Sequence, residues 1–272
     1  MNFSARPRPL AVLIVAFAVS ASVGAMAASS INFAAHPVRL VADDWCPQHC
    51  QAATWGKGYI VDIVGQALAS EGVAYSIVYR PWSRALRQTE LGSFDGLLTP
   101  TVTGYPQFLF PRAAVGYQQY CFYVNATSPW RYGAPADLLG KRVAYLKESG
   151  FGELESFLEG NKTAIHVDQF TGGDDLTKRI FKFLAAGRAD TVIMTSDVAD
   201  LGRRLGDLAP GIRSAGCLAR EKLAVGLSRA DPARARQIAA RLDSGIARLR
   251  QSGRLKLLLD KYGIALWPEE KR

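Results

Sequence analysis

The sequence predicts an α/β fold with two lobes, and three observations support this prediction. From residue 38 onward, short runs rich in β-branched and aromatic residues alternate with segments of helical periodicity. This alternation occurs twice, over 38–98 and over 140–194, which indicates two comparable α/β units. Two further strand-like segments, 115–130 and 217–228, follow the first and the second unit, and they are the natural places for the chain to cross between lobes.

The first unit has the order strand, helix, strand, helix, strand. Residues 38–42 and 73–80 are predicted strands, and the helix between them places apolar side chains on one face and ends at Gly72. Ser83 is the predicted cap of a second helix, and a third strand covers 94–98. This βαβαβ order implies a mainly parallel sheet with right-handed crossovers.

The second unit repeats this order, and a helical tail follows it. Its predicted elements are strands at 140–146, 164–170 and 189–194 and helices at 150–160 and 174–187, the latter capped by Asp174. In the tail, Asp231 and Pro232 form an N-cap and first-turn pair, and a second short helix follows Ser252. We expect these two helices to pack back on the first lobe.

These elements set the predicted domain boundaries. The first lobe comprises 37–118 plus 220–268, and the second lobe comprises 119–219. The crossings between the lobes are expected near 117–124 and 216–227.

The N-terminus has the pattern of a secretory signal peptide. Arg6 and Arg8 precede an apolar run over 10–19, and residues 25–27 match the A-x-A cleavage pattern. We therefore expect residues 1–27 to be removed and the mature protein to be periplasmic, without stable membrane insertion. Loss of the two arginines lowers the formal net charge from +9 to +7, and the remaining basic residues are scattered, so no nucleic-acid partner is expected.

Four cysteines in an oxidising compartment predict disulfides. Cys46 and Cys50 need only a turn between them, which leaves Cys121 with Cys217, although four cysteines allow three pairings. His49 lies between the first two cysteines, so a copper or zinc site, or redox chemistry, is an alternative for this stretch. We expect neither, and no cofactor, because a compact site would need a fourth ligand and reduced thiols.

The order of elements and several phrases resemble the family 3 solute-binding proteins, which serve amino-acid ABC importers. The phrases are "VADDWCP", "GKGYIVDIVGQAL", "YRPWSRALRQTELGSFDGLL" and the ending 226–264, and the resemblance covers nearly the whole mature chain. "PWSRAL" is similar to a proteobacterial branch of the family. The resemblance implies a type 2 periplasmic binding clamp, in which two lobes joined by two hinge strands close on a small solute. It implies a non-enzymatic monomer that delivers this solute to an ABC transporter permease.

The resemblance and the ends of the predicted strands also place the ligand-binding residues. Open α/β sheets bind ligands at the carboxyl ends of their strands. The residues expected in the first lobe are Asp44, Trp45, Tyr59, Trp82, Arg84, Thr99, Thr101, Thr103 and Tyr105. Those expected in the second lobe are Ser149, Gly150, Phe151, Thr195 and Asp197, of which the first three stand at a helix N-terminus that favours an anion.

Two departures from the family pattern leave the chemical class of the ligand undetermined. The arginine that clamps an α-carboxylate is replaced by Pro106, and Arg84 or Arg112 is a candidate substitute. The aspartate that holds an ammonium group is replaced by Thr195, with Asp197 nearby. The predicted ligand is therefore a small polar solute, either amino-acid-like or an organic anion. The alternatives are a ligand-sensing protein that docks on a signalling receptor and a dehydratase-like enzyme, for which Glu148 is the candidate group.

Overall fold

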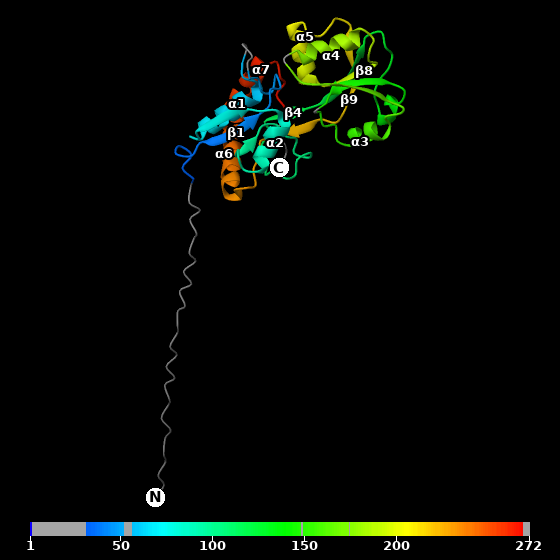
Figure 1. The fold of residues 1–272 in the computed structure, drawn as a ribbon. Coiled ribbons are helices and arrows are strands. Elements are labelled where there is room, and N and C mark those ends of the chain that lie inside the picture. The colour runs from blue at the N-terminus through cyan, green and yellow to red at the C-terminus, as the bar shows by residue number, and fades with distance from the viewer. Residues whose placement is uncertain (2–30, 52–55, 148, 174, 269–272) are drawn as a thin grey trace. The chain divides into compact units, whose positions relative to one another are not determined.

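The computed structural model describes residues 1, 31–51, 56–147, 149–173 and 175–268 (Figure 1). Apart from Met1, the predicted signal peptide lies outside these residues, as do the predicted cap Asp174 and the candidate Glu148. The chain divides into the units Met1–Ser30 and Ile31–Arg272, and the fold described below belongs to the second unit.

The first lobe is built on a four-stranded sheet in the order β11-β3-β1-β2. Strand β1 pairs in parallel with β2 and β3, as the βαβαβ pattern predicts, whereas β11 adds an antiparallel edge. Its strands and helices are β1 (Val38–Ala42), α1 (Tyr59–Ser70), β2 (Tyr75–Tyr79), α2 (Trp82–Glu90), β3 (Gly96–Leu97) and β11 (Gly226–Leu227).

The second lobe is built on a five-stranded sheet in the order β7-β6-β8-β5-β9. Strand β6 is parallel to β7 and β8, while β5 is antiparallel to β8 and β9. Its elements are β5 (Tyr120–Asn125), the short 3-10 helix η1 (Pro135–Leu138), β6 (Arg142–Leu146), α3 (Glu153–Gly160), β7 (His166–Phe170), α4 (Leu176–Ala185), β8 (Thr191–Thr195), α5 (Ser196–Leu205) and β9 (Ile212–Cys217).

A two-stranded antiparallel ribbon lies where the chain passes between the two sheets. It pairs β4 (Gly116–Gln118) with β10 (Glu221–Leu223). Just beyond it, Cys121 and Cys217 are register partners on β5 and β9 and form the predicted disulfide. The outgoing and the returning chain are therefore tied together on the second-lobe side of the ribbon.

The helical tail packs on the first lobe, as the sequence predicts. Helices α6 (Pro232–Gln251) and α7 (Arg254–Lys261) share an apolar core with α1 (Figure 1). A Cβ atom added at Gly245 would lie 2.3 Å from the carbonyl oxygen of Ala67, so this contact between α6 and α1 requires glycine. Within the described residues, no helix is long and apolar enough to cross a membrane.

The structure differs locally from the sequence-based prediction. Helix α2 begins at Trp82, directly after Pro81, so Ser83 is inside the helix and is not its cap. Thr195 is the N-cap of α5. The strand β9 was not expected from the sequence, whereas the predicted cap Asp231 accepts a hydrogen bond from the backbone N–H of Arg234, as expected.

Candidate functional site

A cavity of about 310 Å³ lies where the strand ends of both sheets and the connecting ribbon meet. Parallel α/β sheets bind ligands at the carboxyl ends of their strands, and this volume is typical of a small-molecule site. Its lining residues are Asp43, Trp45, Gln48, His49, Trp82, Thr99, Thr101, Gly104, Tyr105, Gln118, Tyr120, Leu146, Ser149, Gly150, Gly152, Glu155 and Glu221.

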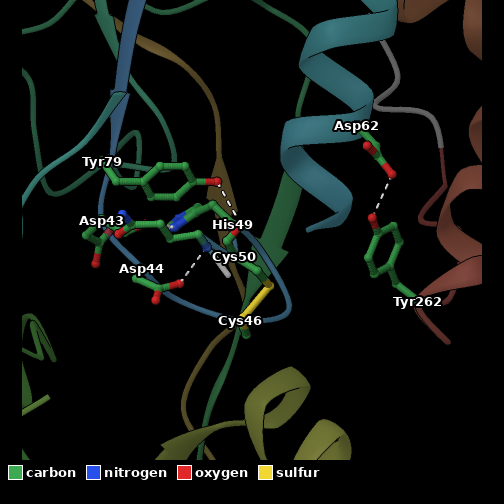
Figure 2. Close-up of a disulfide and its surroundings, with 9 residues drawn as sticks. Asp43, Asp44, Cys46, His49, Cys50, Asp62, Tyr79 and Tyr262 are labelled. Atoms are coloured by element: carbon green, nitrogen blue, oxygen red, sulfur yellow. Dashed lines mark hydrogen bonds and ion pairs between the residues drawn. A yellow bond between two sulfur atoms is a disulfide. The ribbon is translucent and has the colours of Figure 1, made fainter. Parts of the chain in front are cut away.

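The loop after β1 is a compact turn closed by the Cys46–Cys50 disulfide (Figure 2). Trp45 and His49 exchange backbone hydrogen bonds of 2.8 and 3.0 Å across this turn. Tyr79, at the end of β2, donates its hydroxyl to the carbonyl oxygen of Cys50 over 3.0 Å. The disulfide and these bonds hold the loop in the form that places Trp45 in the cavity wall, so its cysteines are structural.

His49 connects this loop to the end of β3. Its Nδ1 lies 2.6 Å from the carbonyl oxygen of Asp43, and its Nε2 lies 2.8 Å from the hydroxyl of Thr99. A carbonyl oxygen only accepts, so Nδ1 carries hydrogen, and in the neutral ring Nε2 accepts from Thr99. Only 1% of the His49 side chain is exposed. Hydrogen bonds at both ring nitrogens fix its position and connect the loop after β1 to Thr99.

Aromatic side chains form much of the cavity wall. Trp82 and Tyr105 meet edge to face, with their ring centres 5.7 Å apart. Tyr120 stacks edge to face on Phe151 at 4.8 Å. Trp45, from the first lobe, packs against the apolar cluster of the second lobe. Rings from both lobes can therefore enclose a solute.

The cavity is acidic. Among the described residues that line it are the carboxylates of Asp43, Glu155 and Glu221, and none is Lys or Arg. Burial raises the pKa of Asp43, while the charge of the neighbouring His49 acts in the opposite direction. Burial also raises the pKa of Tyr105, and the charges of Glu155, Asp43 and Glu221 act in the same direction.

Half of the predicted ligand-binding residues reach the cavity. These residues are Trp45, Trp82, Thr99, Thr101, Tyr105, Ser149 and Gly150. They follow β1, β2, β3 and β6, and strand ends are the places that a sequence pattern can locate.

The other predicted residues do not line the cavity. The side chains of Asp44 and Arg84 lie at the exposed surface, and Asp44 accepts from the backbone N–H of Gln51 over 2.9 Å. The candidate substitute Arg112 is also exposed and lies outside the lining. Thr103 is exposed at the margin, where its hydroxyl donates to Glu221 over 3.3 Å.

The remaining predicted residues lie outside the lining, and all but the partly buried Asp197 are buried. Tyr59 packs in the first-lobe core, and Phe151 packs behind Tyr120. Thr195 is fully buried at the start of α5. Asp197 lies behind Gln48, whose side-chain amide donates to it over 3.1 Å.

Sequence reasoning missed three kinds of lining residue. Asp43, Gln48 and His49 surround Trp45 in the sequence, and the turn closed by the disulfide brings them to the cavity. Glu221 lies on the returning strand of the ribbon, a position that a crossing prediction could have suggested. Glu155 follows the predicted helix start by one turn and could have been found there.

The sulfur atoms of this loop are bonded to each other and are not free as metal ligands. Both cysteines beside His49 are in the disulfide. Within the part of the chain that the structure describes, no group of three His, Cys, Asp or Glu side chains is arranged to hold a metal ion.

Solved structures share this architecture. A putative L-cystine ABC transporter protein from Listeria monocytogenes matches with a TM-score of 0.66 at 20% identity, over 83% of this chain and 95% of that one. The chain has the two-lobe fold of periplasmic binding proteins. The cavity described above is lined from both lobes of this fold.

Two other proteins with this fold have different roles. A histidine kinase sensor domain similar to periplasmic binding proteins matches at a TM-score of 0.66 and 18% identity, over 86% of this chain and 98% of that one. The ancestral amino acid-binding protein AncCDT-1, a precursor of cyclohexadienyl dehydratase, matches at 0.64 and 16%, over 85% and 96%. No protein-family model and no curated protein sequence matches the chain.

Proposed function

We propose that this chain is a family 3 solute-binding protein of the periplasm that captures a small polar solute between its lobes and delivers it to an ABC importer. The single observation that carries the proposal is a cavity of about 310 Å³ lined from both lobes and from the ribbon that joins them. Closure of two lobes around a ligand converts binding energy into a shape that a partner protein can recognise.

Several features of the chain support this role. Rings from both lobes line the cavity, so ligand contacts increase when the lobes approach each other. The two disulfides accord with export to an oxidising compartment. The Listeria protein, which shares the fold, carries the name of an ABC transporter.

A thermal-shift screen of the exported protein tests solute capture. The panel contains amino acids, polyamines, organic acids, sugars and phosphonates, and native mass spectrometry of the purified protein searches for a retained solute. A ligand at 100 times its dissociation constant stabilises the folded state by about 2.7 kcal/mol, which shifts the transition measurably. Failure of every compound to shift it, with no retained solute, would rule out the proposal.

A sensory role is the second candidate, because the histidine kinase sensor domain shares the fold over 86% of this chain. Uptake of the identified solute by cells lacking the gene separates the two functions. If the protein is part of an importer, these cells lose high-affinity uptake of the solute. If it is a sensor, they keep this uptake, provided that the permease is expressed at a constant level. Chemical conversion of the bound solute would instead indicate an enzyme of the dehydratase type.

A further inference from the structure

The charge of the cavity is opposite to that of the chain. Lys and Arg number 33 against 24 for Asp and Glu, yet the described lining residues include three carboxylates and no Lys or Arg. Both sequence neighbours of Glu221 are basic, and neither is part of the lining. Arg220 lies over the ring of Tyr117 at 4.5 Å, and the Lys222 ammonium donates to the carbonyl oxygen of Arg112 over 2.6 Å. Among the described lining residues, only His49, when protonated, could offset a carboxylate, and three carboxylates face it, so the wall carries an excess of negative charge.

One carboxylate oxygen is buried without a hydrogen bond. Asp43 Oδ1 is shielded from solvent and has no hydrogen-bond partner among the described residues, since His49 Nδ1 lies 3.6 Å away and bonds to the backbone. A buried carboxylate oxygen is costly unless it is paired. The Asp43 side chain is 23% exposed and lines the cavity, so its carboxylate can meet a positive group of a ligand.

The aromatic wall suits the same kind of ligand. Trp45, Trp82, Tyr105 and Tyr120 line the cavity together with the three carboxylates. The negative faces of aromatic rings attract ammonium and guanidinium groups, most strongly where water is excluded. The wall thus combines carboxylates and rings, the two groups that stabilise an organic cation.

The described lining residues offer no arginine or lysine to pair with a carboxylate of the ligand. Pro106 stands where the clamping arginine is expected, and Arg84 and Arg112 do not reach the cavity. The N-terminus of α3 could favour an anion, but Glu153 and Glu155 occupy its first turn and oppose it. The cavity therefore disfavours both organic anions and the carboxylate of an amino acid.

We propose that the cavity binds a small organic cation, an amine or guanidine that carries no carboxylate, balanced by Asp43, Glu155 and Glu221 and enclosed by the aromatic wall. This inference rests on the proposed solute-binding function and names the class of solute. It replaces the expected amino-acid-like or anionic ligand with a cationic one.

Matched ligands test the inference by isothermal titration calorimetry on the exported protein. Putrescine, 1,4-butanediol and succinate have the same four-carbon length but are cationic, neutral and anionic. Agmatine and L-arginine differ in the carboxylate alone. We expect binding of putrescine or agmatine, none of butanediol or succinate, and at least about tenfold weaker binding of arginine than of agmatine.

Two variants link binding to the cavity. Glu221→Gln should weaken binding of the cation by about tenfold or more, because a charged hydrogen-bond partner is lost. Glu159→Gln, on α3 but outside both the lining and the first turn, is the matched control and should change affinity by less than about twofold.

The two proposals fail in different ways. Binding of succinate, or of arginine as tightly as agmatine, would overturn the cationic class while leaving solute capture intact. Cation binding that Glu221→Gln leaves unchanged would overturn the assigned site. If no compound of this set or of the thermal-shift panel binds, solute capture and the cationic class both fall.

Discussion

At the scale of single residues, Thr99 in the cavity wall has a backbone conformation that is unusual for its residue type. Its φ of 64° is in the left-handed region, which β-branched residues rarely adopt. Its side chain is buried, and its hydroxyl bonds to His49 Nε2. Backbone strain of this kind persists where surrounding contacts enforce it, and it is common at binding sites.

We predict that Thr99→Ala lowers the free energy of unfolding by about 1–3 kcal/mol, because His49 Nε2 is left buried without its partner. Urea unfolding measures this change. Thr99→Ser retains the hydroxyl and is the control, so it should keep most of the stability. Equal losses in the two variants would show that the hydrogen bond contributes nothing.

Some lining residues of the cavity could be predicted from the sequence, and others could not. Trp45, Trp82 and Thr99 were found because they follow strands, and strand ends meet at one edge of a sheet. Arg84 was misplaced because helical periodicity does not fix on which side of α2 a polar residue lies. The acidic character arises from residues far apart in the chain, such as Asp43 and Glu221, and only the fold brings these together.

At the scale of elements, strongly patterned segments were predicted and weakly patterned ones were not. Helix α1 and strand β1 have clear apolar periods, and the structure contains both. Strand β9 has the sequence IRSAGC, whose small and polar residues give no alternation, and its pairing with β5 is imposed by the tertiary fold. The tail helices were predicted correctly because a cap and an apolar face coincide.

Helix α6 is anchored to the first sheet by an ion pair with two hydrogen bonds. Arg234 Nε and Nη2 donate to the two carboxylate oxygens of Asp95 over 2.6 and 3.0 Å. Nη2 also donates to the carbonyl oxygens of His36 and Pro37, each over 3.1 Å. The two charged side chains are only 15% and 20% exposed, so solvent screens this pair less than a surface pair.

We predict that Arg234→Lys lowers the free energy of unfolding by about 1–3 kcal/mol, since a lysine ammonium cannot reproduce the planar bidentate arrangement. Chemical denaturation measures the change. Arg236→Lys, at an exposed position of the same helix, is the control and should change stability by less than about 0.5 kcal/mol. A loss of the same size in both variants would contradict the anchoring role.

At the scale of the whole molecule, a hydrogen bond between two side chains joins the two lobes beside the cavity. Gln48 Nε2, in the loop after β1, donates to Asp197 Oδ2 at the start of α5 over 3.1 Å. Burial raises the pKa of Asp197, and hydrogen bonds, that of Gln48 first among them, act in the opposite direction. The folded protein therefore carries this charge at a cost at neutral pH.

We predict that Asp197→Asn raises the free energy of unfolding at neutral pH, because the cost of burying the charge is removed while an amide oxygen still accepts from Gln48. This gain must exceed the loss of the hydrogen bond that Oδ1 accepts from the backbone N–H of Val198 over 2.9 Å. The raised pKa means that the folded wild-type protein binds this proton more readily than the unfolded chain does. The cost is therefore present above the folded pKa, shrinks as the pH falls through it, and vanishes below the ordinary value of 3.8.

Urea unfolding of the variant and the wild type from about pH 3 to pH 8 measures this dependence. The advantage of Asp197→Asn should be largest at neutral pH and disappear at the acid end. Asp200→Asn, at an exposed position of the same helix, is the control and should not reproduce that profile. If Asp197→Asn is less stable at neutral pH, the charged hydrogen bond between the lobes outweighs the cost of burial, and the ionised carboxylate stabilises the contact between them.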